Sequence, residues 1–218
     1  MREKIIDAIR QEGLIAIVRG IEKEKLIPLA EAMYRGGVRL LEITYSANGA
    51  VSDAETADRI GMLKQHFGTR MYIGAGTVLS AEQVKLTHAA GGEFIISPDC
   101  NADVIMETKR LGLVSIPGAF SPTEAQQAHR TGADFVKLFP VTNLGADYVK
   151  AISAPLSHVA FLAVGGIDLD NMRTYKKAGV CGFGIGSNII DRRMLDQNDF
   201  AGIEALAHRY VAAAKEGF

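Results

Sequence analysis

The sequence has few of the residues that build disulfide frameworks and metal clusters. Its 218 residues include two cysteines, Cys100 and Cys181, five histidines and no tryptophan. Two cysteines so far apart match no metal-ligand spacing and argue against a disulfide framework, which suits a reducing compartment. No apolar run approaches the length of a membrane span or a signal-peptide core, and residues 1–10 mix charges with isoleucines at helical spacing. We therefore expect a cytoplasmic protein.

The sequence also lacks an excess of charge of either sign. Lysine plus arginine number 24 and aspartate plus glutamate number 25, which gives a formal net charge of −1. Because these charges are scattered along the chain, no basic field is available to hold nucleic acid or an anionic membrane. We expect the partner to be a small molecule.

Short apolar runs rich in valine, isoleucine and phenylalanine alternate with longer amphipathic stretches, which is the pattern of βαβ units around a parallel sheet. Eight such units in a chain with 48% hydrophobic residues predict one domain over residues 1–218. The expected fold class is α/β, a (β/α)8 TIM barrel with an extra N-terminal helix. The predicted strands are Leu14–Val18, Leu40–Ile43, Met71–Ile73, Glu93–Ile96, Val114–Ile116, Asp134–Leu138, Ala160–Ala163 and Gly182–Ile185. The predicted helices between and after them are Glu24–Arg35, Ala54–His66, Ala81–Ala90, Ala102–Leu111, Pro122–Thr131, Ala146–Ile152, Leu169–Lys177 and Phe200–Lys215.

A doubly wound open sheet is the alternative fold. It would be expected to carry a G-x-G-x-x-G turn after its first strand, and Ile17–Ile21 has no such run of glycines. The segment Met1–Gln11 precedes the first strand, so we expect it to form an extra helix over the N-terminal mouth of the barrel.

Lys137 is the most distinctive residue because it lies inside a predicted strand, whereas the other lysines fall in predicted helices or at their ends. In barrels of this kind the active site is built at the carboxyl ends of the strands. Burial of an ammonium group lowers its pKa and leaves a neutral amine that can attack a ketone. The alternative is a structural lysine that pairs with a buried carboxylate or extends to the rim.

Glu42 is a carboxylate in a second apolar strand. Its burial is expected to raise its pKa, so that the group can both accept and donate a proton. The alternative is a plain salt bridge from Glu42 to Lys137 or Arg19.

Other polar residues and glycines also follow predicted strands. Arg19 ends the first strand and has the planar fork that suits a substrate carboxylate, and Thr77 adds a hydroxyl nearby. After the last two strands, paired glycines and a serine resemble a phosphate cradle, although tight turns also use glycine for geometry alone. The predicted substrate-binding residues are Arg19, Thr44, Thr77, Pro98, Gly165, Gly166, Gly186 and Ser187.

The histidines do not predict a metal site. A metal-dependent barrel enzyme needs imidazoles that converge at the carboxyl ends of the strands. His66, His88, His129 and His208 fall in predicted helices, and His158 precedes the seventh strand at the opposite mouth. We expect no metal.

A series of short motifs runs along nearly the whole chain: Ala16-Ile17-Val18-Arg19, Gly36-Gly37-Val38, Leu41-Glu42-Ile43-Thr44, Gly74-Ala75-Gly76-Thr77-Val78, Ile96-Ser97-Pro98, Pro117-Gly118, Lys137-Leu138-Phe139-Pro140, Gly165-Gly166-Ile167 and Gly186-Ser187. In these motifs the chain resembles the 2-keto-3-deoxy-6-phosphogluconate (KDPG) and 4-hydroxy-2-oxoglutarate (KHG) aldolases. The resemblance implies that Lys137 forms a Schiff base with the keto acid and Glu42 transfers protons. It further implies that Arg19 and Thr77 bind the carboxylate and that Gly165, Gly166 and Ser187 bind phosphate.

The implied reaction is cleavage of a 2-keto-3-deoxy-6-phospho sugar acid to pyruvate and glyceraldehyde 3-phosphate, with 4-hydroxy-2-oxoglutarate as a further substrate. No metal or organic cofactor is required, and members of the family are typically homotrimers. Two positions depart from the pattern of many members: Ser46 replaces an arginine, whose part Arg19 is expected to take, and Val164 replaces a threonine, as in the phosphogalactonate-type aldolases.

Three other functions remain open at this point. A 2-dehydro-3-deoxy-6-phosphogalactonate aldolase would differ in the stereochemistry at C4. A phosphate-binding barrel isomerase or epimerase would use Glu42 as a base with Lys137 as an electrostatic partner. A non-catalytic barrel would bind sugar phosphates without turnover.

Overall fold

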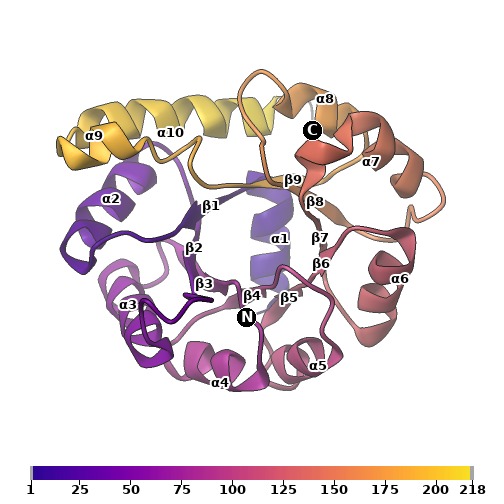
Figure 1. Cartoon of the computed structure of the whole chain (residues 1–218). Coiled ribbons are helices and arrows are strands. Elements are labelled where there is room, and N and C mark those ends of the chain that lie inside the picture. The colour runs from indigo at the N-terminus through magenta and orange to yellow at the C-terminus, as the bar shows by residue number, and fades with distance from the viewer. Residues whose placement is uncertain (1, 217–218) are drawn as a thin grey trace.

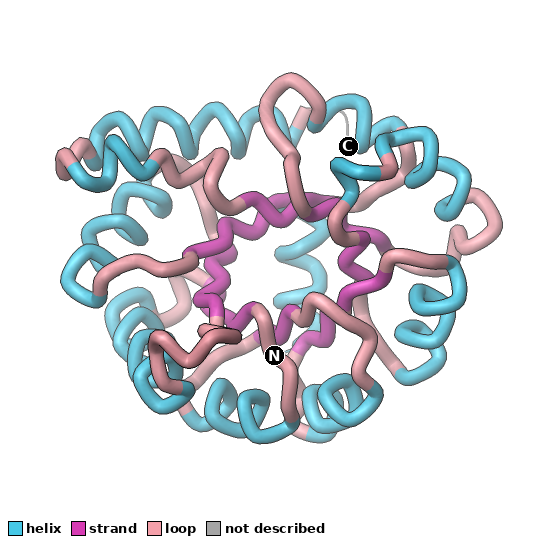
Figure 2. The backbone as a smooth tube through the Cα atoms, viewed as in Figure 1, coloured by secondary structure: helices cyan, strands magenta, loops and turns pink. Residues whose placement is uncertain are grey.

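The computed structural model describes residues 2–216, which form a ring of parallel strands inside a ring of helices (Figure 1, Figure 2). The sheet has nine strands in the order β5-β4-β3-β2-β1-β9-β8-β7-β6. Their bounds are β1 Leu14–Val18, β2 Leu40–Thr44, β3 Tyr72–Gly76, β4 Phe94–Ile96, β5 Val114–Ile116, β6 Gly118–Ala119, β7 Val136–Leu138, β8 Phe161–Val164 and β9 Gly182–Ile185. The predicted TIM-barrel fold is confirmed.

The ninth strand, β6, was not predicted: it follows Pro117, directly after β5, which has the bounds predicted for the fifth strand. β5 pairs with β4 and β6 pairs with β7, so the two short strands are halves of one barrel strand. Proline has no backbone N–H to donate to a ladder. Its carbonyl still accepts a hydrogen bond from the Lys137 N–H at 2.8 Å, so the barrel closes at this point.

Helices follow the strands at nearly the predicted positions. Their bounds are α1 Arg2–Glu12, α2 Lys23–Arg35, α3 Asp53–Phe67, α4 Ala81–Ala89, α5 Ala102–Arg110, α6 Pro122–Thr131, α7 Gly145–Ser153, α8 Met172–Lys177 and α10 Phe200–Lys215. α8 begins later than predicted, because Asp168 accepts hydrogen bonds from the N–H groups of Asp170 and Asn171 in a turn before the helix. The 3-10 turn Val141–Asn143 and the short helix α9, Arg192–Asp196, were not predicted.

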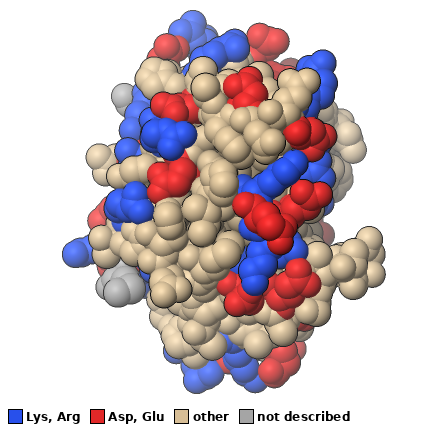
Figure 3. Space-filling view, turned by 90° about the vertical axis from the view of Figure 1, so that its left-hand side faces the viewer, with Lys and Arg blue, Asp and Glu red and all other residues tan. Residues whose placement is uncertain are grey.

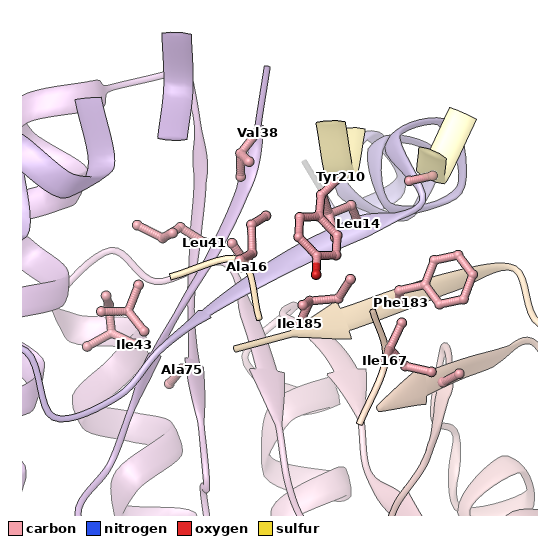
Figure 4. Close-up of a cluster of buried hydrophobic side chains, with 14 of the residues drawn as sticks. Leu14, Ala16, Val38, Leu41, Ile43, Ala75, Ile167, Phe183, Ile185 and Tyr210 are labelled. Carbon is pink, nitrogen blue, oxygen red and sulfur yellow. The ribbon is translucent and has the colours of Figure 1, made fainter. Parts of the chain in front are cut away.

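Side chains alternate between two faces along each strand, as the pleat requires. On β1, Leu14, Ala16 and Val18 point outward into the core between strands and helices, part of which Figure 4 shows. Ile15 points inward to a second, smaller core inside the barrel.

The inner core is closed from below by α1. Ile5, Ile6 and Ile9 of this helix pack against inward-facing residues such as Phe94 and Phe135. Figure 1 shows α1 across the far opening of the barrel, so the predicted covering helix is confirmed for the described residues; Met1 lies outside them. The upper half of the barrel is therefore the half left open for a ligand.

The buried carboxylate of Asp134 joins α1 and α5 to the barrel. It forms ion pairs with Arg2 of α1 and with Lys109 of α5, the latter at 2.7 Å, and it accepts a hydrogen bond from the Ser115 N–H at 2.9 Å. These contacts fix the N-terminal helix over the barrel mouth.

Charges of both signs are interspersed on the face drawn in Figure 3. Among the described residues, no helix combines the length and apolar character needed to cross a bilayer.

Candidate active site

The alternation of β2 carries Glu42 into the barrel. Leu40 packs in the inner core, and Glu42, two residues later, lies on the same face one layer higher with 2% of its surface exposed. A Cβ atom at Gly76 of the neighbouring strand β3 would lie 1.6 Å from Glu42 Oε1. The observed position of the Glu42 carboxylate therefore requires a glycine at position 76.

One oxygen of Glu42 is free to meet a ligand. Thr44 Oγ1 donates a hydrogen bond to Oε1 at 3.1 Å, whereas the buried Oε2 has no partner among the described residues. Neither oxygen thus accepts a hydrogen bond from Lys137 or Arg19, and the plain salt bridge considered above is not observed. Buried polar atoms are usually paired, so an orphaned carboxylate oxygen marks a place where a ligand is expected to bind.

The same alternation places Lys137 on the inner face of β7. Phe135 packs in the inner core, and Lys137 follows one layer higher with 6% of its surface exposed. Its Nζ lies 4.5 Å from the centroid of the Phe139 ring. The amine is therefore buried close to an aromatic face rather than extended to the rim.

Burial shifts both ionisable groups toward their neutral forms. Desolvation raises the pKa of Glu42, and attraction by Lys137, the hydrogen bond from Thr44 and the charge of Arg19 oppose the shift. Desolvation lowers the pKa of Lys137, attraction by Glu42 opposes this, and the positive charge of Arg19 adds to it. A neutral amine and a carboxyl group that can exchange protons are the requirements of imine chemistry.

A cavity of about 450 Å³ opens above these two groups. It brings together seven of the ten predicted site residues: Lys137, Glu42, Arg19, Gly165, Gly166, Gly186 and Ser187. Val164, Asn188 and Arg192 also line it.

Thr44 and Thr77 line an adjacent cavity, also of about 450 Å³, which shares Arg19 with the first. Arg19 Nη2 donates a hydrogen bond to Thr77 Oγ1 at 3.3 Å. Thr77 has φ of 54°, a left-handed conformation that is strained for a β-branched residue and occurs most often at functional sites. Pro98 lines neither cavity; its carbonyl packs against Gly118, where a Cβ would lie 2.2 Å from the oxygen.

The glycine pair after β8 forms a shaped turn. Gly165 and Gly166 have φ of 95° and 72°, and Thr142 Oγ1 donates a hydrogen bond to the Gly165 carbonyl at 2.7 Å. Asn171 Nδ2 donates a hydrogen bond to the Gly166 carbonyl at 2.8 Å. The backbone N–H groups of Gly166 and Ser187 donate to no other described group, which leaves them for an anion.

Arg192 was missed by the sequence analysis. It is the first residue of α9, for which the only sequence signal is the N-capping residue Asp191, whose side chain accepts hydrogen bonds from the N–H groups of Arg193 and Met194. No group of three or more histidine, cysteine, aspartate or glutamate residues in the described part of the chain is arranged to hold a metal ion.

Comparisons with known proteins agree with this geometry. A family model described as KDPG and KHG aldolase matches residues 5–206. The chain belongs to this family. It is therefore an aldolase, a carbon–carbon lyase, and the resemblance found in the sequence is confirmed.

Three relatives illustrate the range of the family. The chain is 32% identical over 209 residues to a 2-dehydro-3-deoxy-phosphogluconate aldolase of Treponema pallidum, covering 94% of this chain and 95% of that protein. It is 33% identical over 177 residues to a 2-dehydro-3-deoxy-6-phosphogalactonate aldolase of Escherichia coli, covering 81% and 83%. A solved structure of KDPG aldolase from Legionella pneumophila, with pyruvate captured as a covalent carbinolamine, has a TM-score of 0.81 and 28% identity and covers 93% of this chain and 96% of that one.

Proposed function

We propose that this protein is a class I aldolase that cleaves 2-dehydro-3-deoxy-6-phosphogluconate to pyruvate and glyceraldehyde 3-phosphate. The observation that carries the proposal is a buried lysine, Lys137, which shares a cavity with the buried carboxyl group of Glu42 and is not bonded to it. The Legionella relative, in which pyruvate forms a covalent carbinolamine, supports the same chemistry.

In the proposed reaction the neutral amine of Lys137 attacks the C2 carbonyl carbon to give a carbinolamine. Glu42 donates a proton to the departing hydroxyl group, water leaves, and a protonated imine forms. The carboxylate of Glu42 then removes the proton of the C4 hydroxyl group. The C3–C4 bond breaks and its electrons move toward the imine nitrogen. Glyceraldehyde 3-phosphate is released, and an enamine of pyruvate remains bound to Lys137. Protonation of the enamine at C3 and hydrolysis of the imine release pyruvate and restore the amine.

The remaining predicted residues would hold the two ends of the substrate. We assign the carboxylate to Arg19 and Thr77, which already contact each other. We assign the phosphate to the turn Gly165–Gly166 and to Gly186 and Ser187, whose positions around one cavity fit an anion. Thr44 would orient Glu42 through its hydrogen bond.

A phosphogalactonate-type substrate is the second candidate, because Val164 gives the cavity wall an apolar side chain. By the resemblance described above, many phosphogluconate-type members have a threonine at this position, whereas phosphogalactonate-type members tend to have valine. The similarity to the Escherichia coli phosphogalactonate aldolase agrees with it. One hydroxyl contact changes a preference by about 1–3 kcal/mol, so comparison of kcat/KM for the two C4 epimers, and for 4-hydroxy-2-oxoglutarate, would identify the preferred substrate.

The decisive experiment is reduction with sodium borohydride in the presence of pyruvate, followed by intact mass measurement and peptide mapping. We expect a stable adduct on Lys137, with none in Lys137→Ala. Turnover by Lys137→Ala should fall by about 10⁴-fold or more while its thermal unfolding stays cooperative. The absence of an adduct in the wild type would refute the Schiff-base mechanism and favour the isomerase alternative.

We further propose a cytoplasmic homotrimer that needs no cofactor. Among residues 2–216, the large apolar side chains that are exposed lie on or next to the adjacent elements α4, α5 and α6 (Figure 1); they are Leu79, Leu86, Met106 and Phe120. Such a grouping favours association between subunits. Light scattering during size-exclusion chromatography would give the subunit number, and cell fractionation would test the location.

A further inference from the structure

Arg192 places a positive charge in the wall of the cavity that also contains Lys137 and Glu42. It is the first residue of α9, beyond β9, and its exposed side chain lines the cavity together with Gly186 and Ser187. Its Nη2 donates a hydrogen bond to the carbonyl of Gly20 at 2.8 Å. No carboxylate of the described residues pairs with it; the nearby Asp191 bonds to Arg193 instead.

The other charged groups of the cavity are already assigned. Glu42 and Lys137 lie at the reacting centre, and Arg19 contacts Thr77 at the proposed carboxylate site. The turn Gly165–Gly166 and Ser187 offer only neutral donors to an anion. Among the described lining residues, Arg192 is thus the one cation left for a phosphate ester, which carries close to two negative charges at neutral pH.

We propose that Arg192 is a specificity-determining residue that binds the terminal phosphate of the substrate and so selects phosphorylated keto acids over short ones such as 4-hydroxy-2-oxoglutarate. This inference rests on the proposed function. A guanidinium group with donors left after one hydrogen bond to Gly20 can form charge-assisted bonds to two phosphate oxygens. A short keto acid has no phosphate to reach α9, so its cleavage does not use this contact.

The competing role is structural. Through its bond to the Gly20 carbonyl, Arg192 also links α9 to the loop after β1, which carries Arg19. If Arg192 acted only through this loop, its loss would displace Arg19 and weaken the binding of every keto acid to the same degree. The two roles therefore differ in how the loss is distributed between phosphorylated and unphosphorylated substrates.

The test compares Arg192→Ala with the matched control Arg193→Ala. Arg193 is the next residue on α9, its side chain is 90% exposed, and it does not line the cavity. For Arg192→Ala we expect kcat/KM for 2-dehydro-3-deoxy-6-phosphogluconate to fall by about 10- to 100-fold, mainly through KM. Cleavage of 4-hydroxy-2-oxoglutarate and borohydride trapping of pyruvate should stay at wild-type levels, and Arg193→Ala should behave as the wild type throughout.

Calorimetric titration with glycerol 3-phosphate separates this inference from the proposed function, because it needs no turnover. Weaker binding in Arg192→Ala than in Arg193→Ala supports the phosphate contact even if no pyruvate adduct forms. Equal losses of kcat/KM for phosphorylated and unphosphorylated keto acids in Arg192→Ala would overturn the proposed phosphate contact. Unchanged binding of glycerol 3-phosphate would overturn it as well.

Discussion

Gly76→Ala should inactivate the enzyme by displacing Glu42. A Cβ at position 76 would lie 1.6 Å from Oε1 and 2.0 Å from Cδ of Glu42, closer than any real Cβ contact. The carboxyl group must therefore retreat by about 1 Å or more, and a misplacement of that size costs on the order of 10²-fold in rate. Because Glu42 is buried in a packed strand, relief of the overlap should also cost about 1–3 kcal/mol of stability.

Gly74→Ala is the matched control. Gly74 lies on the same strand and face one layer lower, and its Cβ would meet the Phe94 ring at 2.3 Å rather than Glu42. We expect comparable destabilisation in urea unfolding of both variants, but loss of kcat only in Gly76→Ala. The assay is steady-state cleavage of the phosphorylated keto acid at saturating substrate. Wild-type kcat in Gly76→Ala, or an equal loss in both variants, would refute the reasoning.

Three further changes test other contacts. Glu42→Gln removes the negative charge that holds the pKa of Lys137 up against burial, so this pKa should fall further and the acid limb of borohydride trapping should move to lower pH. Turnover should fall by about 10²–10⁴-fold, and an acid limb at higher pH would contradict the electrostatic argument. Asp134→Ala leaves Lys109 without its carboxylate partner and leaves Arg2 paired only with the exposed Glu3, so it should cost about 1–3 kcal/mol in urea unfolding without a change in kcat. Gly166→Ala would place a Cβ 2.3 Å from Thr142 Oγ1 at a φ of 72°, so KM for the phosphorylated substrate should rise about 10-fold while pyruvate trapping is unchanged.

The sequence was sufficient for the barrel and for its two reactive groups. Apolar runs separated by amphipathic stretches predicted all eight barrel strands, and a charged residue inside an apolar run identified Glu42 and Lys137. The alternation of the pleat explains why this signal was reliable: each charged residue follows an inward-facing apolar residue, Leu40 or Phe135, by one layer. A lysine or glutamate that enters the barrel in this way must lie in the cavity above the inner core.

Features that depend on contacts between distant segments were not predictable. β3 extends to Gly76 although glycine disfavours strands, because small inward residues make room for Glu42. The positive φ of Thr77 contradicts the preference of a β-branched residue and is visible only in the folded backbone. Arg192 was missed because α9 has five residues, too few to show helical periodicity.

The structure also bears on the arginine that Ser46 replaces. Ser46 lines the cavity that Arg19 and Thr77 share, but its hydroxyl donates to Asn48 Oδ1 at 2.7 Å. Arg59, the other cation that lines that cavity, donates hydrogen bonds to Glu55 Oε1 at 2.6 Å and to the Ile21 carbonyl. Arg19 pairs with no described carboxylate, and its described side-chain hydrogen bond goes to a neutral hydroxyl group. Of the two arginines, Arg19 alone can therefore meet a substrate carboxylate without giving up an ion pair, which is why we expect it to take the part of the missing arginine.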